Sequence, residues 1–183
     1  YQTVYADPGK LNSVAAPTAG LHFNNNHLDH LKSKDIQFAE ITLNIGLGTF
    51  KPIKVKRVED HVIHQEKISI DLDTVETILK AKNEGRRVIA IGTTVLRCLE
   101  SVATDFSSLE PYEGETGLYI YPGYQFKIVD ALLTNFHLPK SSLFLLVSAF
   151  GGSERIMSAY LHAIRNEYRF FSYGDSMFIT NNE

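Results

Sequence analysis

The chain has 183 residues, of which 44% are hydrophobic and 21% charged, and its net charge is −3. These proportions exclude an intrinsically disordered chain and supply enough apolar residues for a folded core. The small negative charge argues against non-specific nucleic-acid binding, which depends on an excess of basic residues, so any RNA contact is expected at a local patch.

The single cysteine, Cys98, excludes an internal disulfide and fits a reducing compartment. The longest apolar run, at 143–147, is much shorter than the ~20 residues of a membrane span. The first ten residues lack the cationic and apolar pattern of a signal peptide. Because the chain begins at Tyr1 and not at methionine, we expect it to be an internal fragment, a processed product or the ordered part of a longer protein.

Loop-forming residues dominate positions 1–20, and a short helix is expected after 24–26. Apolar and polar residues alternate over 39–48, which is the period of a strand. Residues 52–66 are expected to be extended or irregular. A short strand follows at 67–70.

A helix is then predicted to begin at Asp73, because Glu76 lies three residues later in a capping-box pattern, and to end at Gly85. Residues 87–91 form a near-continuous apolar run, typical of a strand buried on both faces. The next helix is expected to follow directly and to end at Ala103.

The remaining predictions rest on polar clusters, apolar runs and helical spacing of apolar residues. They are a polar loop at 104–117, strands at 118–121 and 130–135, a helix at 141–149, a second helix after Gly151 and Gly152, and a last strand at 177–180. Alternating strands and helices predict an α/β fold, with 1–183 as a single domain and helices on both faces of its sheet.

The stretch 129–142, VDALLTNFHLPKSS, is the most informative part of the chain. Its apolar run ends at Thr134, Asn135 and His137, just before a predicted helix. Polar residues at such a strand end are where an open α/β sheet tends to hold its ligand, and helix N-termini favour anions. A polar loop with a structurally satisfied histidine is an equally good interpretation.

Gly92, Thr93 and Thr94 also lie between a strand and a helix. Their backbone N–H groups and hydroxyls could hold a carboxylate or a phosphate, although ordinary N-capping by either threonine is equally compatible. The chain has no Walker sequence, and Gly46 and Gly48 lack the third glycine of a dinucleotide-binding motif. These absences argue against nucleotide binding of either kind.

His61, His64 and Glu66 are the nearest approach to a metal-binding motif. Their spacing does not match HExxH and no cysteine accompanies them, so we expect no metal. His22 lies between Gly20 and Phe23, where a ligand contact and a structural role are equally compatible.

Cationic and aromatic residues gather near the C-terminus, at Arg165, Arg169, Phe170, Phe171 and Tyr173. Such side chains can stack on nucleobases and pair with phosphates. A helix end with arginines near its negative pole and aromatic side chains packed into the core is the favoured interpretation.

Several longer motifs follow one another along the chain: PTAGLHF (17–23), GLGTF (46–50), HVIHQE (61–66), IAIGTTVLRCLE (89–100), YPGYQFKIVDALLTNFHLPKSSLFLLVSAF (121–150) and YRFFSYGDSMFI (168–179). In this order they closely resemble the S-adenosylmethionine:tRNA ribosyltransferase-isomerase family of queuosine biosynthesis. The resemblance extends from Tyr1 to about Ile179.

The resemblance implies an αβα-layered sheet domain, the larger domain of the family, with the family's β-barrel domain mostly or wholly absent. The chain would then be a C-terminal fragment of a two-domain enzyme. Family members transfer the ribosyl group of S-adenosylmethionine to 7-aminomethyl-7-deazaguanine at the tRNA wobble position. The product is epoxyqueuosine, and adenine and methionine are released.

This chemistry calls for general acids and bases, each worth roughly 10²–10⁴-fold in rate. The matching motif positions imply the catalytic candidates His22, His64, Glu66, Asp130 and His137, with acid and base unassigned. The implied substrate-binding residues are Thr18, Gly20, Gly48, Thr49, Gly92, Thr93, Thr94, Arg97, Thr134, Asn135, Arg169 and Tyr173.

Among these, the segment 92–94 is expected to hold the methionine carboxylate or the ribose. Thr134 and Asn135 are expected to hold a base edge. Arg97, Arg169 and Tyr173 are expected to meet the tRNA.

The resemblance implies two partners, a tRNA carrying 7-aminomethyl-7-deazaguanine and S-adenosylmethionine, which is a substrate and not a recycled cofactor. It implies no other cofactor, no metal, no membrane contact, a cytoplasmic location and a monomeric full-length enzyme. The alternative interpretation is a catalytically inactive fragment that binds substrate.

Overall fold

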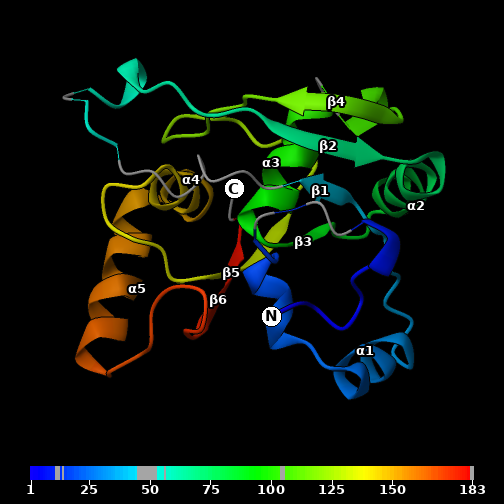
Figure 1. Cartoon of the computed structure of the whole chain (residues 1–183), viewed down its shortest axis with the longest axis horizontal. Helices are drawn as coiled ribbons and strands as arrows, with labels where there is room; N and C mark the ends of the chain where they lie inside the picture. Colours follow the sequence, from blue (N-terminus) through cyan, green and yellow to red (C-terminus); the bar gives the residue numbers. More distant parts are fainter. Residues whose placement is uncertain (11–12, 14, 45–52, 56, 104–105, 182–183) are drawn as a thin grey trace.

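The computed structural model in Figure 1 describes residues 1–10, 13, 15–44, 53–55, 57–103 and 106–181. Within these residues the chain forms two three-stranded sheets and five α-helices. This confirms the α/β class. None of the described helices has both the length and the apolar character needed to cross a membrane.

The first sheet is antiparallel and has the strand order β1-β2-β4. Its strands are β1 (Thr42–Asn44), β2 (Glu66–Ile70) and β4 (Tyr112–Thr116). Burial alternates along β2, as expected for a strand with one covered face. Glu66, Ile68 and Ile70 are therefore all turned toward the interior.

The second sheet has the order β3-β5-β6 and contains β3 (Ile89–Ile91), β5 (Ala131–Asn135) and β6 (Ser176–Thr180). β3 runs parallel to β5, with Ile91 opposite Leu133, whereas β6 is antiparallel to β5. The apolar sequence of β5 is explained by its central position, because both of its edges are hydrogen-bonded to other strands.

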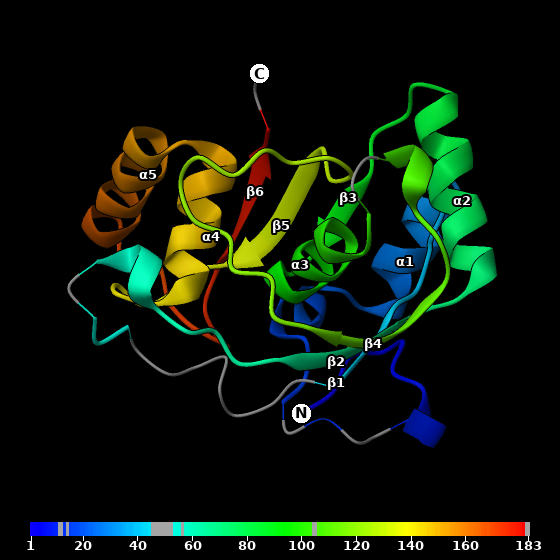
Figure 2. The same ribbon diagram turned by 90° about the horizontal axis from the view of Figure 1, so that it is seen from above.

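The helices are α1 (Asn25–Lys32), α2 (Leu72–Asn83), α3 (Thr93–Val102), α4 (Ser142–Gly151) and α5 (Ser153–Arg165). Helix α3 lies between the two sheets and contacts β3, β5 and β4 (Figure 1). Helix α4 packs on β6 and α5, and Figure 2 shows this pair on the opposite side of the molecule from α1 and α2.

One hydrophobic core extends across both sheets and includes Ile68 of β2, Leu99 of α3, Leu132 of β5 and Val147 of α4. Because α3 is covered from two sides, six of its ten residues are buried, including the charged residues Arg97 and Glu100. The sequence predicted a single sheet, so the division into two sheets with α3 enclosed between them was not foreseen.

Several element predictions were wrong in detail. Helix α2 begins at Leu72 and not at Asp73, because the Asp71 carboxylate caps it by accepting from the Thr74 N–H at 2.9 Å. Strand β3 is an edge strand, and Ile89 is 39% exposed, so this strand is not buried on both faces.

The predicted polar loop at 104–117 contains β4, and the predicted strand at 118–121 belongs to neither sheet. β4 has the sequence YEGET, whose polar side chains suit an edge strand with an exposed face. Of the strand predicted at 39–48, the structure describes β1, and residues 45–48 lie outside the described residues.

Candidate functional site

The candidate site lies at the carboxyl ends of the parallel strands β3 and β5. The Gly92 N–H donates to the Leu133 carbonyl at 2.8 Å, which keeps the two strand ends together one residue beyond β3. A cavity of about 160 Å³ opens there, and its wall includes Thr18, Gly92, Thr94, Thr134, Asn135 and His137. Open α/β sheets hold ligands at this edge.

Helix α3 points its N-terminus into this cavity. Its N-cap is Gly92, at φ 102° and ψ 146°, and no side chain caps the helix. Uncapped N–H groups of the first turn carry the positive end of the helix dipole and favour an anion. The alternative interpretation of N-capping by Thr93 or Thr94 is therefore wrong, since both threonines lie inside the helix and line the cavity.

Helix α4 also begins at the cavity, but its first turn is already satisfied. The Ser141 hydroxyl accepts from the Phe144 N–H at 3.1 Å and donates to the Leu138 carbonyl at 2.7 Å. Between the two helix starts, that of α3 is the one left open for a ligand.

His137 is held on one side of the β5 end. Its Nε2 lies 2.9 Å from the Thr134 hydroxyl, and its backbone N–H donates to the Tyr160 hydroxyl at 2.8 Å. Burial lowers the pKa of His137 to about 4. The imidazole is therefore neutral near pH 7 and can accept a proton but cannot serve as a cationic acid.

His22 is held on the other side of the same strand end. The Thr18 hydroxyl donates to the Asn135 side-chain oxygen at 3.2 Å, and the Asn135 amide nitrogen lies 3.1 Å from His22 Nε2. An amide nitrogen only donates, so His22 Nε2 accepts and the proton of the neutral ring is on Nδ1. Consecutive residues of β5, Thr134 and Asn135, thus each orient one histidine.

Gly20 lies in the same short helix as His22 and does not line the cavity. A Cβ atom at this position would collide with the Tyr5 hydroxyl and would lie 2.8 Å from Thr3 Cγ2. The glycine is therefore required for packing of the short helix η2 (Thr18–His22) against the N-terminal segment.

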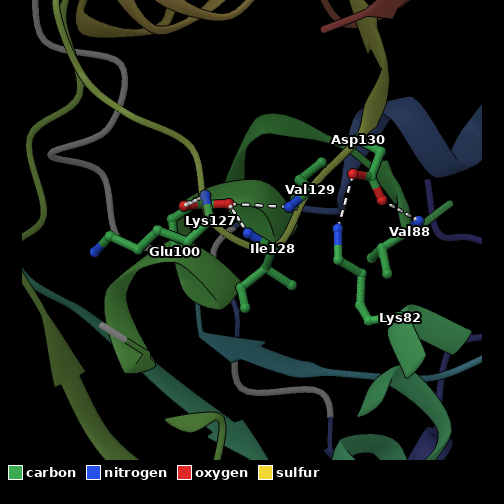
Figure 3. Close-up of polar contacts among 7 residues, drawn as sticks. All are labelled: Lys82, Val88, Glu100, Lys127, Ile128, Val129 and Asp130. Atoms are coloured by element: carbon green, nitrogen blue, oxygen red, sulfur yellow. Dashed lines mark hydrogen bonds and ion pairs between the residues drawn. The ribbon is translucent and has the colours of Figure 1, made fainter. Parts of the chain in front are cut away.

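Asp130 lies at the opposite end of β5 from the cavity. Its carboxylate accepts from the Lys82 ammonium at 2.8 Å and from the Val88 N–H at 2.7 Å (Figure 3). The structure thus separates Asp130 from the two histidines and gives it a role in joining α2, β3 and β5.

Glu66 and Arg97 form a buried ion pair between β2 and α3, and each residue is 3% exposed. Arg97 Nε has no hydrogen-bond partner among the described residues. The expected contact of Arg97 with tRNA is contradicted by this burial. Neither side chain lines the cavity.

The other expected site residues lie apart or outside the described residues. His64 is exposed and does not line the cavity, whereas Arg169 and Tyr173 are exposed on the loop whose Phe171 and Ser172 do line it. Gly48 and Thr49 lie outside the described residues. No group of three metal-binding side chains occurs among the residues that the structure describes.

Sequence reasoning missed Glu100, the residue that anchors β5. Its carboxylate, 1% exposed, accepts from the N–H groups of Lys127, Ile128 and Val129 at 2.8, 2.9 and 3.0 Å (Figure 3). The sequence did contain a signal, because Glu100 follows Leu96 by one helical turn and so lies on the apolar side of α3. A buried charge in that position needs a hydrogen-bonding partner.

Comparison with known proteins points to one family. A sequence model described as "Queuosine biosynthesis protein" matches residues 1–179. The S-adenosylmethionine:tRNA ribosyltransferase-isomerase of Nitratidesulfovibrio vulgaris strain DP4 is 53% identical over 179 residues, which are 98% of this chain and 48% of that protein. The protein of the same name from Natranaerobius thermophilus is 54% identical over 181 residues, covering 99% and 52%.

A solved structure agrees with these relatives. The crystal structure of S-adenosylmethionine tRNA ribosyltransferase from Thermotoga maritima is 41% identical and superposes with a TM-score of 0.73. The match covers 88% of this chain and 51% of that one. The chain spans about half the length of the curated relatives that it matches.

Proposed function

The chain belongs to the queuosine biosynthesis protein family, and from this premise we propose that it forms part of an S-adenosylmethionine:tRNA ribosyltransferase-isomerase. The reaction moves the ribosyl group of S-adenosylmethionine to 7-aminomethyl-7-deazaguanine at the tRNA wobble position, forms epoxyqueuosine and releases adenine and methionine. The names of the similar proteins support this proposal.

One observation carries the proposal for the site. An uncapped helix start and His137 meet at one cavity at the carboxyl ends of β3 and β5, and Asn135 on the cavity wall binds His22, which lies behind that wall. The cavity, at about 160 Å³, is smaller than the roughly 300–1,000 Å³ of a site that encloses a drug-sized ligand. It therefore accommodates the reacting part of the substrates, with the rest lying outside it.

The proposed roles follow from charge and hydrogen bonding. The N-terminus of α3, at Gly92, Thr93 and Thr94, holds the methionine carboxylate of S-adenosylmethionine, because the positive end of the helix dipole attracts the negative carboxylate. His137 acts as the base. Its low pKa keeps the imidazole unprotonated near pH 7, so it can accept the ribose proton that the neighbouring sulfonium acidifies.

His22 does not line the cavity itself, and its proposed role is to donate a hydrogen bond from Nδ1–H to the departing adenine, in the part of the substrate that lies outside the cavity. Thr134 and Asn135 act mainly by positioning the two histidines, because their side chains are already engaged with them. This replaces the expectation that both residues hold a base edge directly.

We also propose that the chain folds as one domain, that the enzyme acts in the cytoplasm as a monomer, and that no cofactor or metal is needed beyond the substrate S-adenosylmethionine. The cytoplasmic location is supported by the proposed tRNA substrate and by the lone, buried cysteine.

The decisive experiment measures adenine release from S-adenosylmethionine in the presence of tRNA that carries the 7-aminomethyl-7-deazaguanine precursor. The Natranaerobius relative is the positive control, and binding of S-adenosylmethionine to this chain is measured in parallel by calorimetry. Binding with release supports the full proposal, and binding without release supports the inactive-fragment alternative. A chain that neither binds S-adenosylmethionine nor releases adenine contradicts both the full proposal and the inactive-fragment alternative.

The same calorimetry tests the anion site with a matched pair of glycines. Gly92→Ala is expected to weaken S-adenosylmethionine binding at least tenfold, because a Cβ at φ 102° forces the helix start out of position. Gly123→Ala is the control, since Gly123 has a similar φ of 105° in a turn with open space around it. Equal affinities for the two variants would show that the α3 start does not bind the substrate.

A further inference from the structure

The loop 168–175, which follows α5, is closed by hydrogen bonds between its own residues, from backbone N–H groups to backbone carbonyls and to the Asp175 carboxylate. The Arg169 N–H donates to the Asp175 carboxylate at 2.8 Å, and the Asp175 N–H donates to the Arg169 carbonyl at 2.7 Å. The Gly174 N–H donates to the Phe171 carbonyl at 3.0 Å, and a Cβ at Gly174 would collide with the Arg169 carbonyl. The loop is thus locally fixed in shape.

Phe171 is held at the tip of this loop in an uncommon backbone conformation, with φ 69°. A bulky residue rarely adopts this region, and such strain is found mainly where function requires it. The Phe171 N–H donates to the Phe136 carbonyl at 3.0 Å, which ties the loop to the end of β5. The ring lines the cavity and is nevertheless 50% exposed.

The neighbouring phenylalanines show that exposure of Phe171 is selective. Phe136 is 4% exposed, and its ring packs against Phe170 with centroids 5.0 Å apart. Phe136 therefore belongs to the core, and Phe170 is partly buried against it. The expectation that the C-terminal aromatic side chains pack into the core holds for Phe170 but is wrong for Phe171 and Tyr173, which are 50% and 77% exposed.

Other side chains of the loop complete a surface suited to RNA. Tyr173 is 77% exposed, with its ring centroid 5.3 Å from that of Tyr1, and the side chain of Arg169 is 75% exposed, with its guanidinium 3.4 Å from the Asp175 carboxylate. Proteins that bind single-stranded nucleic acid combine exposed aromatic rings, which stack on bases, with cations that meet phosphates. The loop offers both beside a cavity too small to hold more than the reacting groups.

We infer that loop 168–175 is a preformed stacking platform for an unpaired nucleobase of the RNA substrate, with Phe171 as the stacking ring. The inference rests on the proposed function, because it takes tRNA as the substrate. When the wobble base enters the cavity, a neighbouring base in the anticodon loop loses its stacking partner. Phe171 replaces that partner at the rim, and Arg169 lies beside the adjoining phosphate.

The test uses the intact chain and an RNA hairpin with a seven-nucleotide anticodon loop. The fluorescent base 2-aminopurine is placed in turn on either side of the wobble position, because its emission is quenched by stacking. Phe171→Asn removes the ring while asparagine still tolerates the positive φ, and Phe171→Trp restores a ring. Phe178→Thr on β6 is the control, since Phe178 is 54% exposed.

The wild-type chain, Phe171→Trp and Phe178→Thr are expected to bind the hairpin and quench one of the two labels. Phe171→Asn is expected to lose the quenching and to bind the hairpin about tenfold more weakly, as stacking on one base predicts.

Unaltered quenching and affinity in Phe171→Asn would contradict the stacking platform alone. Failure of the wild-type chain to bind the hairpin would also contradict the proposal that tRNA is the substrate. Light scattering provides a separate check. A wild-type dimer that Phe171→Asn dissociates without RNA would assign the ring to self-association and would also overturn the platform.

Discussion

His137 and His22 flank the end of β5 in unequal environments. His137 lies against the Thr134 hydroxyl and the Tyr160 hydroxyl, and desolvation disfavours its protonated form. His22 has a similar, intermediate exposure and accepts a hydrogen bond from Asn135. Two histidines beside neighbouring positions of one strand are therefore held by different partners.

The lowered pKa of His137 predicts a pH dependence of stability. Its folded pKa of about 4 lies below the ordinary value of 6.5, so between these pH values the unfolded chain binds a proton that the folded chain does not. Its contribution to stability is complete above pH ~6.5 and is lost as the pH falls toward 4, with a slope of up to about 1.4 kcal/mol per pH unit.

Urea unfolding at pH 7.5, 6 and 5 measures this slope. His137→Gln is expected to flatten it, whereas His162→Gln, on the exposed side of α5, is expected to leave it unchanged. The same slope in the His137 variant as in the wild type would show that another group is responsible.

Elements with strong local signals were predictable from the sequence, and those defined by distant partners were not. β2, β5, β6 and the helices from α2 to α5 follow from apolar spacing and their end residues. β4 did not, because its polar sequence becomes a strand only when β2 lies beside it. At the site, the Thr134 and His137 pair was predictable from one motif, whereas the Glu66–Arg97 pair required knowledge of how β2 packs on α3.

At the level of elements, Glu100 of α3 fixes the segment that leads into β5. Glu100→Gln is expected to lower the free energy of unfolding by about 1–3 kcal/mol, because the amide cannot accept from all three N–H groups of 127–129 and leaves at least one unpaired. Chemical denaturation measures the loss, with the exposed Glu110→Gln as the control. Equal stability of the two variants would contradict the anchoring role.

In the whole molecule, the Glu66–Arg97 pair connects the β1-β2-β4 sheet to the helix that carries the site. Arg97→Met is expected to cost about 3–5 kcal/mol, since it leaves a buried carboxylate without its guanidinium. The double variant Glu66→Met/Arg97→Met is expected to recover much of this loss, because an apolar pair restores the packing without an isolated charge.

Unfolding curves for both variants, followed by fluorescence and circular dichroism together, measure these changes. Arg57→Met is the control, because the Arg57–Glu59 pair is 3.5 Å apart on the surface, where an ion pair contributes about 0–1 kcal/mol. A double variant no more stable than Arg97→Met would show that the pair has a stabilising role that apolar packing cannot replace.

The enclosure of α3 between the sheets also determines how the protein can be labelled. Cys98, the lone thiol of the sequence, is 0% exposed, and burial raises its pKa to about 12. The thiolate that reacts with maleimides and iodoacetamides is therefore scarce and inaccessible in the folded protein. A cysteine introduced on an exposed surface, for a spectroscopic probe or a crosslinker, can then be modified selectively in the native sequence background.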